Sequence, residues 1–214
     1  MGTDFLRKVA ISSLQEPGKA GKTLPKAKNP KIIVFRHSET HDNVRRIFSG
    51  RRDTKLTEVG VRQSRELGEK LKKYRIVKGY YPDLERCRRT IVLALKECLG
   101  IKMQKEGLLL ERDYGQLTGK SKLKAMRDYP EKAVLWRRGY REGPPGGESL
   151  EEVEKRVWPF CQRLEKEARE TEGIIAVCGS NNSMRIIRRY FEKLTVEQMQ
   201  SLENPYGDFV AYSV

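Results

Sequence analysis

Short apolar runs that alternate with longer amphipathic stretches are the feature that most constrains the fold of this chain. The continuous runs Ile32–Phe35 and Ile174–Cys178 are typical of strands buried on both faces. Two further strands are predicted at Ile76–Tyr80 and Phe209–Ser213. Strands that are separated by helices form mostly parallel sheets with helices on both faces. The predicted fold is therefore α/β, with a mostly parallel sheet covered by helices on both faces.

Capping residues indicate where the helices begin. A serine or threonine hydroxyl can accept a hydrogen bond from a free amide group in the first turn of a helix, and Ser149 with Glu152 forms a complete capping box. Three predicted helices run from Thr57 to about Tyr74, from about Leu84 to near Gly100, and from Ser149 to about Thr171 with Pro159 inside. A fourth helix is predicted to start near Ser183, and a short fifth one is capped by Thr195 with Gln198.

The first 30 residues differ in composition from the rest. They are rich in Lys, Gly, Pro and Ser, show no apolar periodicity and end in Asn29-Pro30. We predict a flexible basic leader at residues 1–30 and a single domain at residues 31–214. A basic targeting peptide is the alternative. Gly18–Thr23 has part of a phosphate-binding loop pattern, but Glu16 stands where its first glycine is required and no strand precedes it.

Overall charge and cysteine spacing limit the function classes. Lys and Arg number 44 against 29 Asp and Glu, and the resulting net charge of +15 attracts anions such as phosphorylated metabolites or nucleic acid. The four cysteines have no CxxC spacing, which favours reduced thiols in the cytoplasm over disulfides or a metal site. No apolar run is long enough to cross a bilayer, and we expect no membrane association.

The residues that follow the first buried strand suggest an anion site, because ligands of such sheets bind beyond the carboxyl ends of the strands. His37, one of two histidines, stands directly after this strand and is either a nucleophile or a hydrogen-bonded structural residue. Arg36 offers a planar, bidentate donor for phosphate oxygens, and Asn43 and Ser49-Gly50 can add further hydrogen bonds. This context favours the nucleophile.

A series of short motifs follows in order along residues 31–214. They are Arg36-His37-Ser38-Glu39-Thr40, Asn43, Phe48-Ser49-Gly50, Asp53, Leu56-Thr57-Glu58-Val59-Gly60, Asp83-Leu84-Glu85-Arg86 with Thr90, Glu111-Arg112-Asp113-Tyr114-Gly115 with Gly119, Trp136-Arg137-Arg138-Gly139-Tyr140, Pro144-Pro145-Gly146-Gly147-Glu148-Ser149-Leu150 and Asn182-Ser183-Met184-Arg185. In this order the motifs resemble the histidine phosphatase superfamily, and in particular its phosphoglycerate mutases that depend on 2,3-bisphosphoglycerate.

The resemblance implies phosphoryl transfer through a phosphohistidine at His37, on small phosphorylated metabolites. Arg36, Arg86 and Asn43 would hold the transferring group, and Glu111 would be the general acid and base. Without the motif, Glu111 would be interpreted as a surface acid paired with its neighbour. Further substrate contacts are implied at Ser49, Gly50, Tyr114, Lys122, Arg137, Arg138, Ser180, Asn181 and Asn182.

The same resemblance implies no prosthetic group and no metal, with 2,3-bisphosphoglycerate as the candidate phosphoryl donor. It favours interconversion of 2- and 3-phosphoglycerate or hydrolysis of phosphomonoesters, and relatives of this kind often form homodimers. On residues alone, Arg137 and Arg138 could instead be a solvated surface cluster.

Two positions depart from the family pattern. Ser38 stands in place of the usual glycine, which a small residue can replace if its φ stays negative. Ser180 stands where the family places a second histidine, and losing one such preorganised donor costs about 3 to 4 kcal/mol. His41 could substitute for it, but an exposed loop residue is the alternative interpretation. We expect activity to be weakened or lost, while binding of phosphate esters is retained.

Three other functions remain as alternatives. The chain could be a regulatory module that binds phosphate esters without turning them over. Nucleic acid could bind the leader with Arg185, Arg188 and Arg189, but no recognised motif accompanies this charge, and we do not expect it. A cysteine-based phosphatase loop from Cys178 to Arg185 would have six intervening residues where five are needed, which favours a buried strand cysteine.

Overall fold

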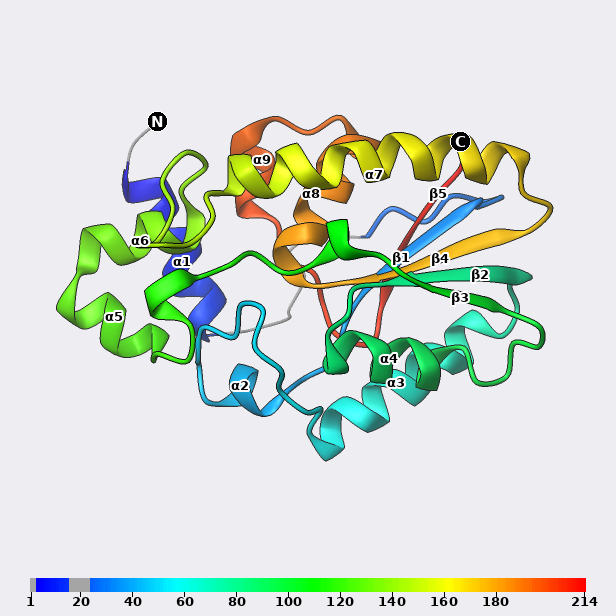
Figure 1. Ribbon diagram of the computed structural model, residues 1–214, viewed down its shortest axis with the longest axis horizontal. Helices are drawn as coiled ribbons and strands as arrows, with labels where there is room; N and C mark the ends of the chain where they lie inside the picture. Colours follow the sequence, from blue (N-terminus) through cyan, green and yellow to red (C-terminus); the bar gives the residue numbers. More distant parts are fainter. Residues whose placement is uncertain (1–2, 16–23) are drawn as a thin grey trace.

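The computed structural model describes residues 3–15 and 24–214. Within them lies a five-stranded sheet in the order β3-β2-β4-β1-β5, in which β5 alone pairs antiparallel to its neighbour (Figure 1). The predicted mostly parallel α/β sheet is confirmed. The strands are β1 (Ile32–Arg36), β2 (Ile76–Tyr81), β3 (Lys102–Lys105), β4 (Ile174–Gly179) and β5 (Phe209–Tyr212).

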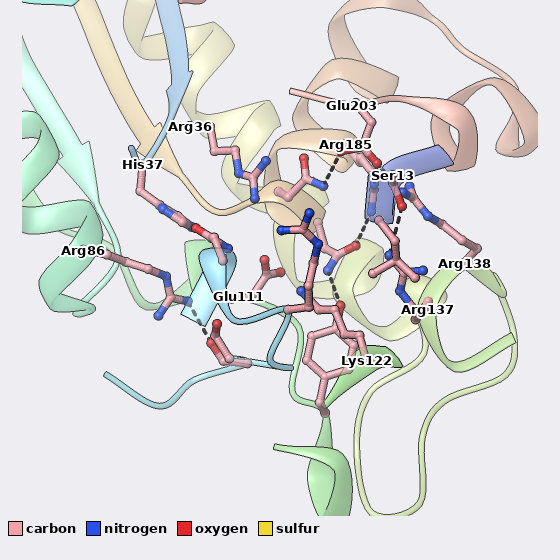
Figure 2. A pocket seen from close by; sticks show the side chains of 18 of the residues that line it. Ser13, Arg36, His37, Arg86, Glu111, Lys122, Arg137, Arg138, Arg185 and Glu203 are labelled. Atoms are coloured by element: carbon pink, nitrogen blue, oxygen red, sulfur yellow. Dashed lines mark hydrogen bonds and ion pairs between the residues drawn. The ribbon is translucent and has the colours of Figure 1, made fainter. Parts of the chain in front are cut away.

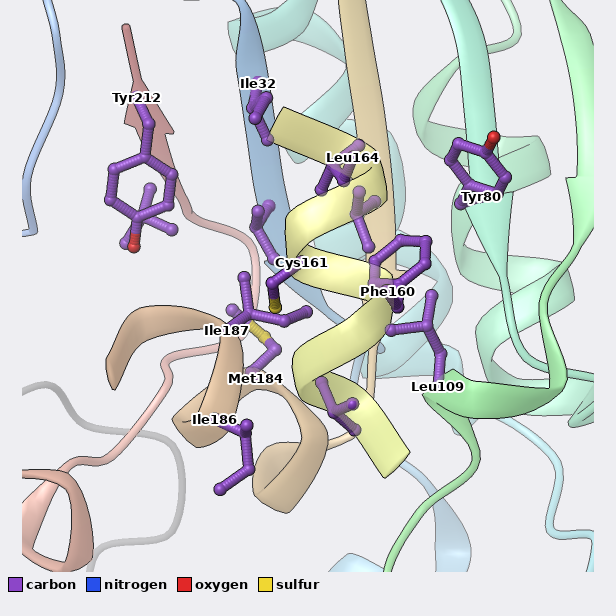
Figure 3. Packing of buried hydrophobic residues seen from close by; sticks show 14 of the residues in the cluster. Ile32, Tyr80, Leu109, Phe160, Cys161, Leu164, Met184, Ile186, Ile187 and Tyr212 are labelled. Atoms are coloured by element: carbon purple, nitrogen blue, oxygen red, sulfur yellow. The ribbon is translucent and has the colours of Figure 1, made fainter. Parts of the chain in front are cut away.

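Helices cover both faces of the sheet. On one face α3 (Glu58–Leu71) and α4 (Glu85–Ala94) pack on the side chains of Ile33, Phe35 and their neighbours. On the other face α7 (Leu150–Glu170) and α8 (Asn181–Glu192) bury Phe160 and Leu164 against β1 and β4 (Figure 3). Because β1 and β4 are central and buried on both faces, their sequences are continuous apolar runs rather than alternating ones.

The predicted caps place the helix starts correctly. The Thr57 hydroxyl accepts from the Gly60 amide at the start of α3, and Ser149 with Glu152 forms the capping box of α7. The same arrangement, with Thr195 and Gln198, opens α9 (Val196–Ser201). Pro159 lies inside α7, which continues to Glu170.

Three short helices lie beyond the carboxyl end of β1. They belong to two insertions that form a small third core of Phe48, Tyr114, Ala125 and Ala133, separate from the two cores on the sheet. The elements here are α2 (His41–Val44), α5 (Lys122–Asp128) and α6 (Pro130–Arg138), with single turns of 3-10 helix at Gly107–Leu109 and Gly115–Leu117. These insertions form one side of the cavity described below (Figure 1).

Part of the expected leader is an ordered helix. Thr3–Gln15 forms α1, which packs on α6 and also contacts α9. The prediction of a flexible leader is therefore wrong for these residues. Its less exposed side chains follow the i, i+3, i+4, i+7, i+8 spacing of an amphipathic helix, and they are Leu6, Val9, Ala10, Ser13 and Leu14. The sequence did not reveal this helix because two of the five positions, Ala10 and Ser13, have small side chains that add little apolar character to the pattern.

The remaining observations concern the rest of the leader, the end of α4 and the strand β3. Gly18–Thr23 lies outside the described residues. Residues 25–27 run beside β5, where the Ala27 amide donates to Ala211 O at 3.0 Å. α4 ends at Ala94, earlier than predicted, and β3 was not predicted because its side chains are all exposed.

No helix in the described part of the chain is both long and apolar enough to span a membrane.

Candidate active site

A cavity opens where β1 and β4 end, and residues of α5 and α6 contribute to its lining (Figure 2). All of the sequence-predicted site residues except Ser180 line it. They are Arg36, His37, Asn43, Ser49, Gly50, Arg86, Glu111, Tyr114, Lys122, Arg137, Arg138, Asn181 and Asn182. The folded chain therefore collects residues from six separate motifs at the edge of the sheet where a ligand was expected.

His37 is held in a defined orientation at the end of β1. Its backbone amide donates to Gly179 O on β4 at 3.0 Å, and the side chain is 4% exposed. Nδ1 lies 2.8 Å from Ser38 O, and because a carbonyl can only accept, Nδ1 bears the hydrogen. Burial, followed by the charges of Arg86 and Arg36, lowers the pKa of His37 well below its ordinary value. The imidazole is therefore neutral at pH 7, with its lone pair on Nε2.

Two buried arginines on either side of His37 retain their positive charge. Arg86 donates to Arg52 O at 3.0 Å and to Gly50 O at 2.8 Å, while Arg36 donates to Asn204 O at 3.2 Å. These acceptors are neutral carbonyls, so they orient the guanidinium groups without cancelling their charge. The Nε–H groups of both arginines have no hydrogen-bond partner among the described residues. Such donors are suited to the oxygens of a phosphoryl group.

Glu111 and Lys122 face the cavity from the insertions. Glu111 is 7% exposed and one carboxylate oxygen accepts from the Arg112 amide at 2.7 Å. Burial, followed by repulsion from Arg137 and Arg36, lowers the pKa of Lys122 to about 7. This lysine can therefore change its charge near neutral pH.

The far end of the cavity contains an ion-pair cluster. Arg138 and Arg185 both donate to Glu203, the latter at 3.0 Å. Burial alone would raise the pKa of Glu203, but the two arginines outweigh it and lower this pKa to about 2. Arg137 makes no contact with this carboxylate and instead donates to α1. Both predicted arginines are buried, which contradicts the interpretation as a solvated surface cluster.

Polar side chains complete the walls. The Asn182 amide donates to the Tyr114 hydroxyl at 3.2 Å, and Asn181 donates to Glu203 at 3.3 Å. Asn43 Oδ1 accepts a hydrogen bond from the backbone amide of Thr40. The NH2 group of the Asn43 side chain therefore points away from this capping contact. Each of these three side-chain amides is therefore held by at least one hydrogen bond.

Ser180 lies behind the cavity wall. It is the N-cap of α8, is fully buried, and its hydroxyl lies 3.4 Å from Arg86 Nη2 and 3.7 Å from Cys87 Sγ. Its contact with the cavity is therefore indirect, through Arg86. His41 is exposed at the start of α2 and does not line the cavity.

Ser38 fits its position without strain. Its φ is not positive, its amide donates to Thr90 Oγ1 at 3.0 Å, and its hydroxyl accepts from Ser64 Oγ at 2.9 Å. The added side chain therefore points towards α3 and α4 rather than into the cavity.

Sequence reasoning missed several residues that line the cavity: Ser13, Leu14, Arg46, Arg185, Glu203 and Tyr206. The sequence groups Arg185 instead with Arg188 and Arg189 as a basic surface. Arg185 and Arg188 are 2% and 4% exposed, and Arg188 and Arg189 pair with Glu192 and Glu154. Arg185 and Arg188 are therefore buried in the fold rather than part of an exposed basic surface.

Cys178 is buried within β4, and burial raises the pKa of its thiol well above the ordinary value. It is a structural residue rather than a nucleophile. Within residues 3–15 and 24–214, no three His, Cys, Asp or Glu side chains are grouped to hold a metal ion.

Comparison with known proteins identifies the family of this chain. Residues 32–213 match the model of the histidine phosphatase superfamily (branch 1). The chain is 34% identical over 190 residues to a 2,3-bisphosphoglycerate-dependent phosphoglycerate mutase of Allorhizobium ampelinum, covering 86% of this chain and 89% of the relative. A protein of the same name from Nitrobacter winogradskyi is 35% identical over 187 residues, covering 85% and 90%. The chain belongs to the histidine phosphatase superfamily.

Solved structures share the fold. A mycobacterial glucosyl-3-phosphoglycerate phosphatase in complex with VO3 superposes with a TM-score of 0.75 at 24% identity, covering 83% of this chain and 88% of that one. The alpha-ribazole phosphatase of Shigella flexneri gives a TM-score of 0.71 at 23% identity, covering 83% and 87%.

Proposed function

We propose that this chain transfers the phosphoryl group of a small phosphorylated metabolite to His37. The observation that supports this most directly is the state of the imidazole. His37 is neutral, its Nδ1–H is committed to Ser38 O, and it lines the cavity with Arg36 and Arg86. A fixed, uncharged imidazole beside two charged donors is what attack on an anionic phosphoryl group requires.

In the proposed reaction, His37 Nε2 attacks phosphorus and a P–N bond forms while the ester P–O bond breaks. Glu111, in its acid form, gives its proton to the leaving oxygen. Arg36 and Arg86 stabilise the charge on the equatorial oxygens. In the second step, water or another hydroxyl gives its proton to the Glu111 carboxylate and takes the phosphoryl group from Nε2.

The two ends of the cavity bear on the class of substrate. Relatives named phosphoglycerate mutases support interconversion of 2- and 3-phosphoglycerate with 2,3-bisphosphoglycerate as donor. The end near His37 fits one phosphoryl group. At the far end, however, Arg138 shares the carboxylate of Glu203 with Arg185, and Arg137 donates to α1. With α1 in this position, we favour hydrolysis of phosphomonoesters.

We further propose that the reaction is slow. Ser180 contacts Arg86 but does not line the cavity, so it cannot donate directly to a phosphoryl group. This observation also supports the second candidate function, a regulatory protein that binds phosphate esters without turning them over.

The test is phosphorylation of the protein itself. The full chain is incubated with p-nitrophenyl phosphate and, separately, with 2,3-bisphosphoglycerate, and acid-labile phosphate is located by mass spectrometry. We expect label on the wild type and on His41→Gln, in which the exposed histidine is changed, but not on His37→Gln. Label that persists in His37→Gln, or its absence from every protein, would contradict the proposal, and the second result would favour the regulatory function.

A further inference from the structure

The helix α1 forms the end wall of the cavity. It packs on α6, the helix that contains Arg137 and Arg138, and it contacts α9. Ala10 is fully buried in this contact, and Ser13 and Leu14 line the cavity. Figure 2 places Ser13 next to Arg137. A segment that precedes the family-matched region by nearly 20 residues therefore contributes directly to the site.

The contact between α1 and Arg137 uses both ends of the guanidinium group. Arg137 Nη1 donates to Ala10 O at 2.6 Å, and Nη2 donates to Ser13 Oγ at 2.9 Å. Both acceptors are uncharged, so the positive charge of Arg137 is not cancelled. Burial and the charge of Arg138 lower the pKa of Arg137 to about 10, which still leaves it protonated at neutral pH.

An anionic ligand group would be a stronger partner for this arginine, because hydrogen bonds to carboxylate or phosphate are about twice as strong as those to neutral acceptors. Only two of the five N–H groups of Arg137, one on each Nη, donate to α1. An anion that binds the two Nη groups side by side would have to displace the helix and expose Ala10. Two further cations at this end, Arg138 and Arg185, share the single carboxylate of Glu203.

We propose that α1 is a specificity-determining wall of the site: by accepting hydrogen bonds from both Nη groups of Arg137 through Ala10 O and Ser13 Oγ, it weakens the binding of a second anionic group. The site then favours phosphomonoesters whose remaining part is small and uncharged over bisphosphorylated or carboxylated ones. This inference rests on the proposed function for the phosphoryl end of the cavity and defines its substrate class.

The experiment displaces α1 in the full chain and measures binding by calorimetry. Ala10→Arg places a long charged side chain in a fully buried position, whereas Ile11→Arg adds the same charge at the neighbouring residue, which is 39% exposed. The probes are 2,3-bisphosphoglycerate, with two phosphates and a carboxylate, and phenyl phosphate, with one phosphate. The third protein is the double variant Ala10→Arg, Arg137→Met, which removes the arginine that α1 covers.

We expect Ala10→Arg to bind 2,3-bisphosphoglycerate about tenfold more tightly than the wild type and Ile11→Arg, the gain expected from one charge-assisted contact. Affinity for phenyl phosphate should change far less, and the double variant should lose the gain. Equal affinities in Ala10→Arg and Ile11→Arg, or a gain that survives Arg137→Met, would overturn the inference.

These measurements are independent of catalysis. A gain in affinity without any label on His37 would support the wall and refute the proposed phosphoryl transfer. Label on His37 without a gain in affinity would refute the wall alone.

Discussion

We expect Lys122 to make anion binding in the cavity sensitive to pH. With a pKa of about 7, its ammonium group adds a positive charge below neutral pH and loses it above. We expect the affinity for sulfate, which stays a dianion throughout, to fall by roughly tenfold between about pH 6 and about pH 8.5, since one charge-assisted contact is lost. Isothermal titration calorimetry at both pH values measures this change.

The matched variant for this prediction is Lys122→Arg, which keeps the charge at every pH in the series. Its sulfate affinity should be nearly independent of pH. A slope equal to that of the wild type would mean that another group is responsible.

Ser180 gives a second prediction at the residue scale. A histidine here could reach past Arg86 towards the phosphoryl group and supply the donor that the family pattern leads us to expect. We expect Ser180→His to raise the rate of His37 phosphorylation by on the order of 100-fold to 1000-fold. The measurement is a single-turnover time course, with Ser180→Ala as the control that should show no gain. If Ser180→His folds but its His37 is phosphorylated as slowly as in Ser180→Ala, the missing histidine at position 180 is not the cause of the slow reaction.

Residues of the site were predictable where they belong to a local motif. Arg36 ends β1, His37 follows it directly, and Glu111 comes soon after a turn of 3-10 helix, and all three line the same cavity. Glu203 and Ser13 could not be found in this way. Each reaches the cavity through contacts with residues more than 60 positions away, such as those with Arg138 and Arg137, and no local pattern encodes such contacts.

At the scale of elements, Gly60 explains why α3 can approach the loop after β1. A Cβ at this position would lie 2.1 Å from Glu39 O, a backbone atom that cannot move aside easily. We expect Gly60→Ala to destabilise the protein by about 1 to 3 kcal/mol, because the clash exceeds the helix propensity gained. Urea unfolding measures this, and His37 phosphorylation should also slow as the loop shifts.

The control for the Gly60 prediction is Gly107→Ala. A Cβ added to this exposed glycine would meet no atom within 4 Å, and its φ is not positive. Its substitution should leave the free energy of unfolding unchanged or slightly raised. A similar loss in both variants would show that the close approach to Glu39 is not the cause.

Elements with strong patterns were predictable from the sequence, and weakly patterned ones were not. β1 and β4 are continuous apolar runs, and α7 has a complete capping box. By contrast, β3 is an exposed edge strand without apolar alternation, and it forms because β2 offers free backbone groups. α1 likewise depends on α6, a partner more than 100 residues away, to bury its narrow apolar face.

For the molecule as a whole, the question is whether anions bind to the general positive field or to the cavity. A net charge of +15 attracts anions everywhere, but surface attraction is screened by salt, whereas buried arginines are screened much less. A ligand that binds only the folded state raises the melting temperature in proportion to the logarithm of its concentration. Inorganic phosphate should therefore stabilise this protein even in about 0.15 M sodium chloride, where the Debye length is about 8 Å.

Two variants with the same net charge separate these explanations. Arg86→Gln removes a 1% exposed arginine of the cavity, while Arg169→Gln removes one on α7 whose side chain is 58% exposed. Because Arg86 also bonds Gly50 O and Arg52 O, its loss lowers stability by itself, so each protein is compared with itself, with and without phosphate. We expect the phosphate-induced rise in melting temperature to persist in Arg169→Gln and to disappear in Arg86→Gln. Equal rises in the two variants would place the bound phosphate on the surface and remove the main support for a phosphoryl site at His37.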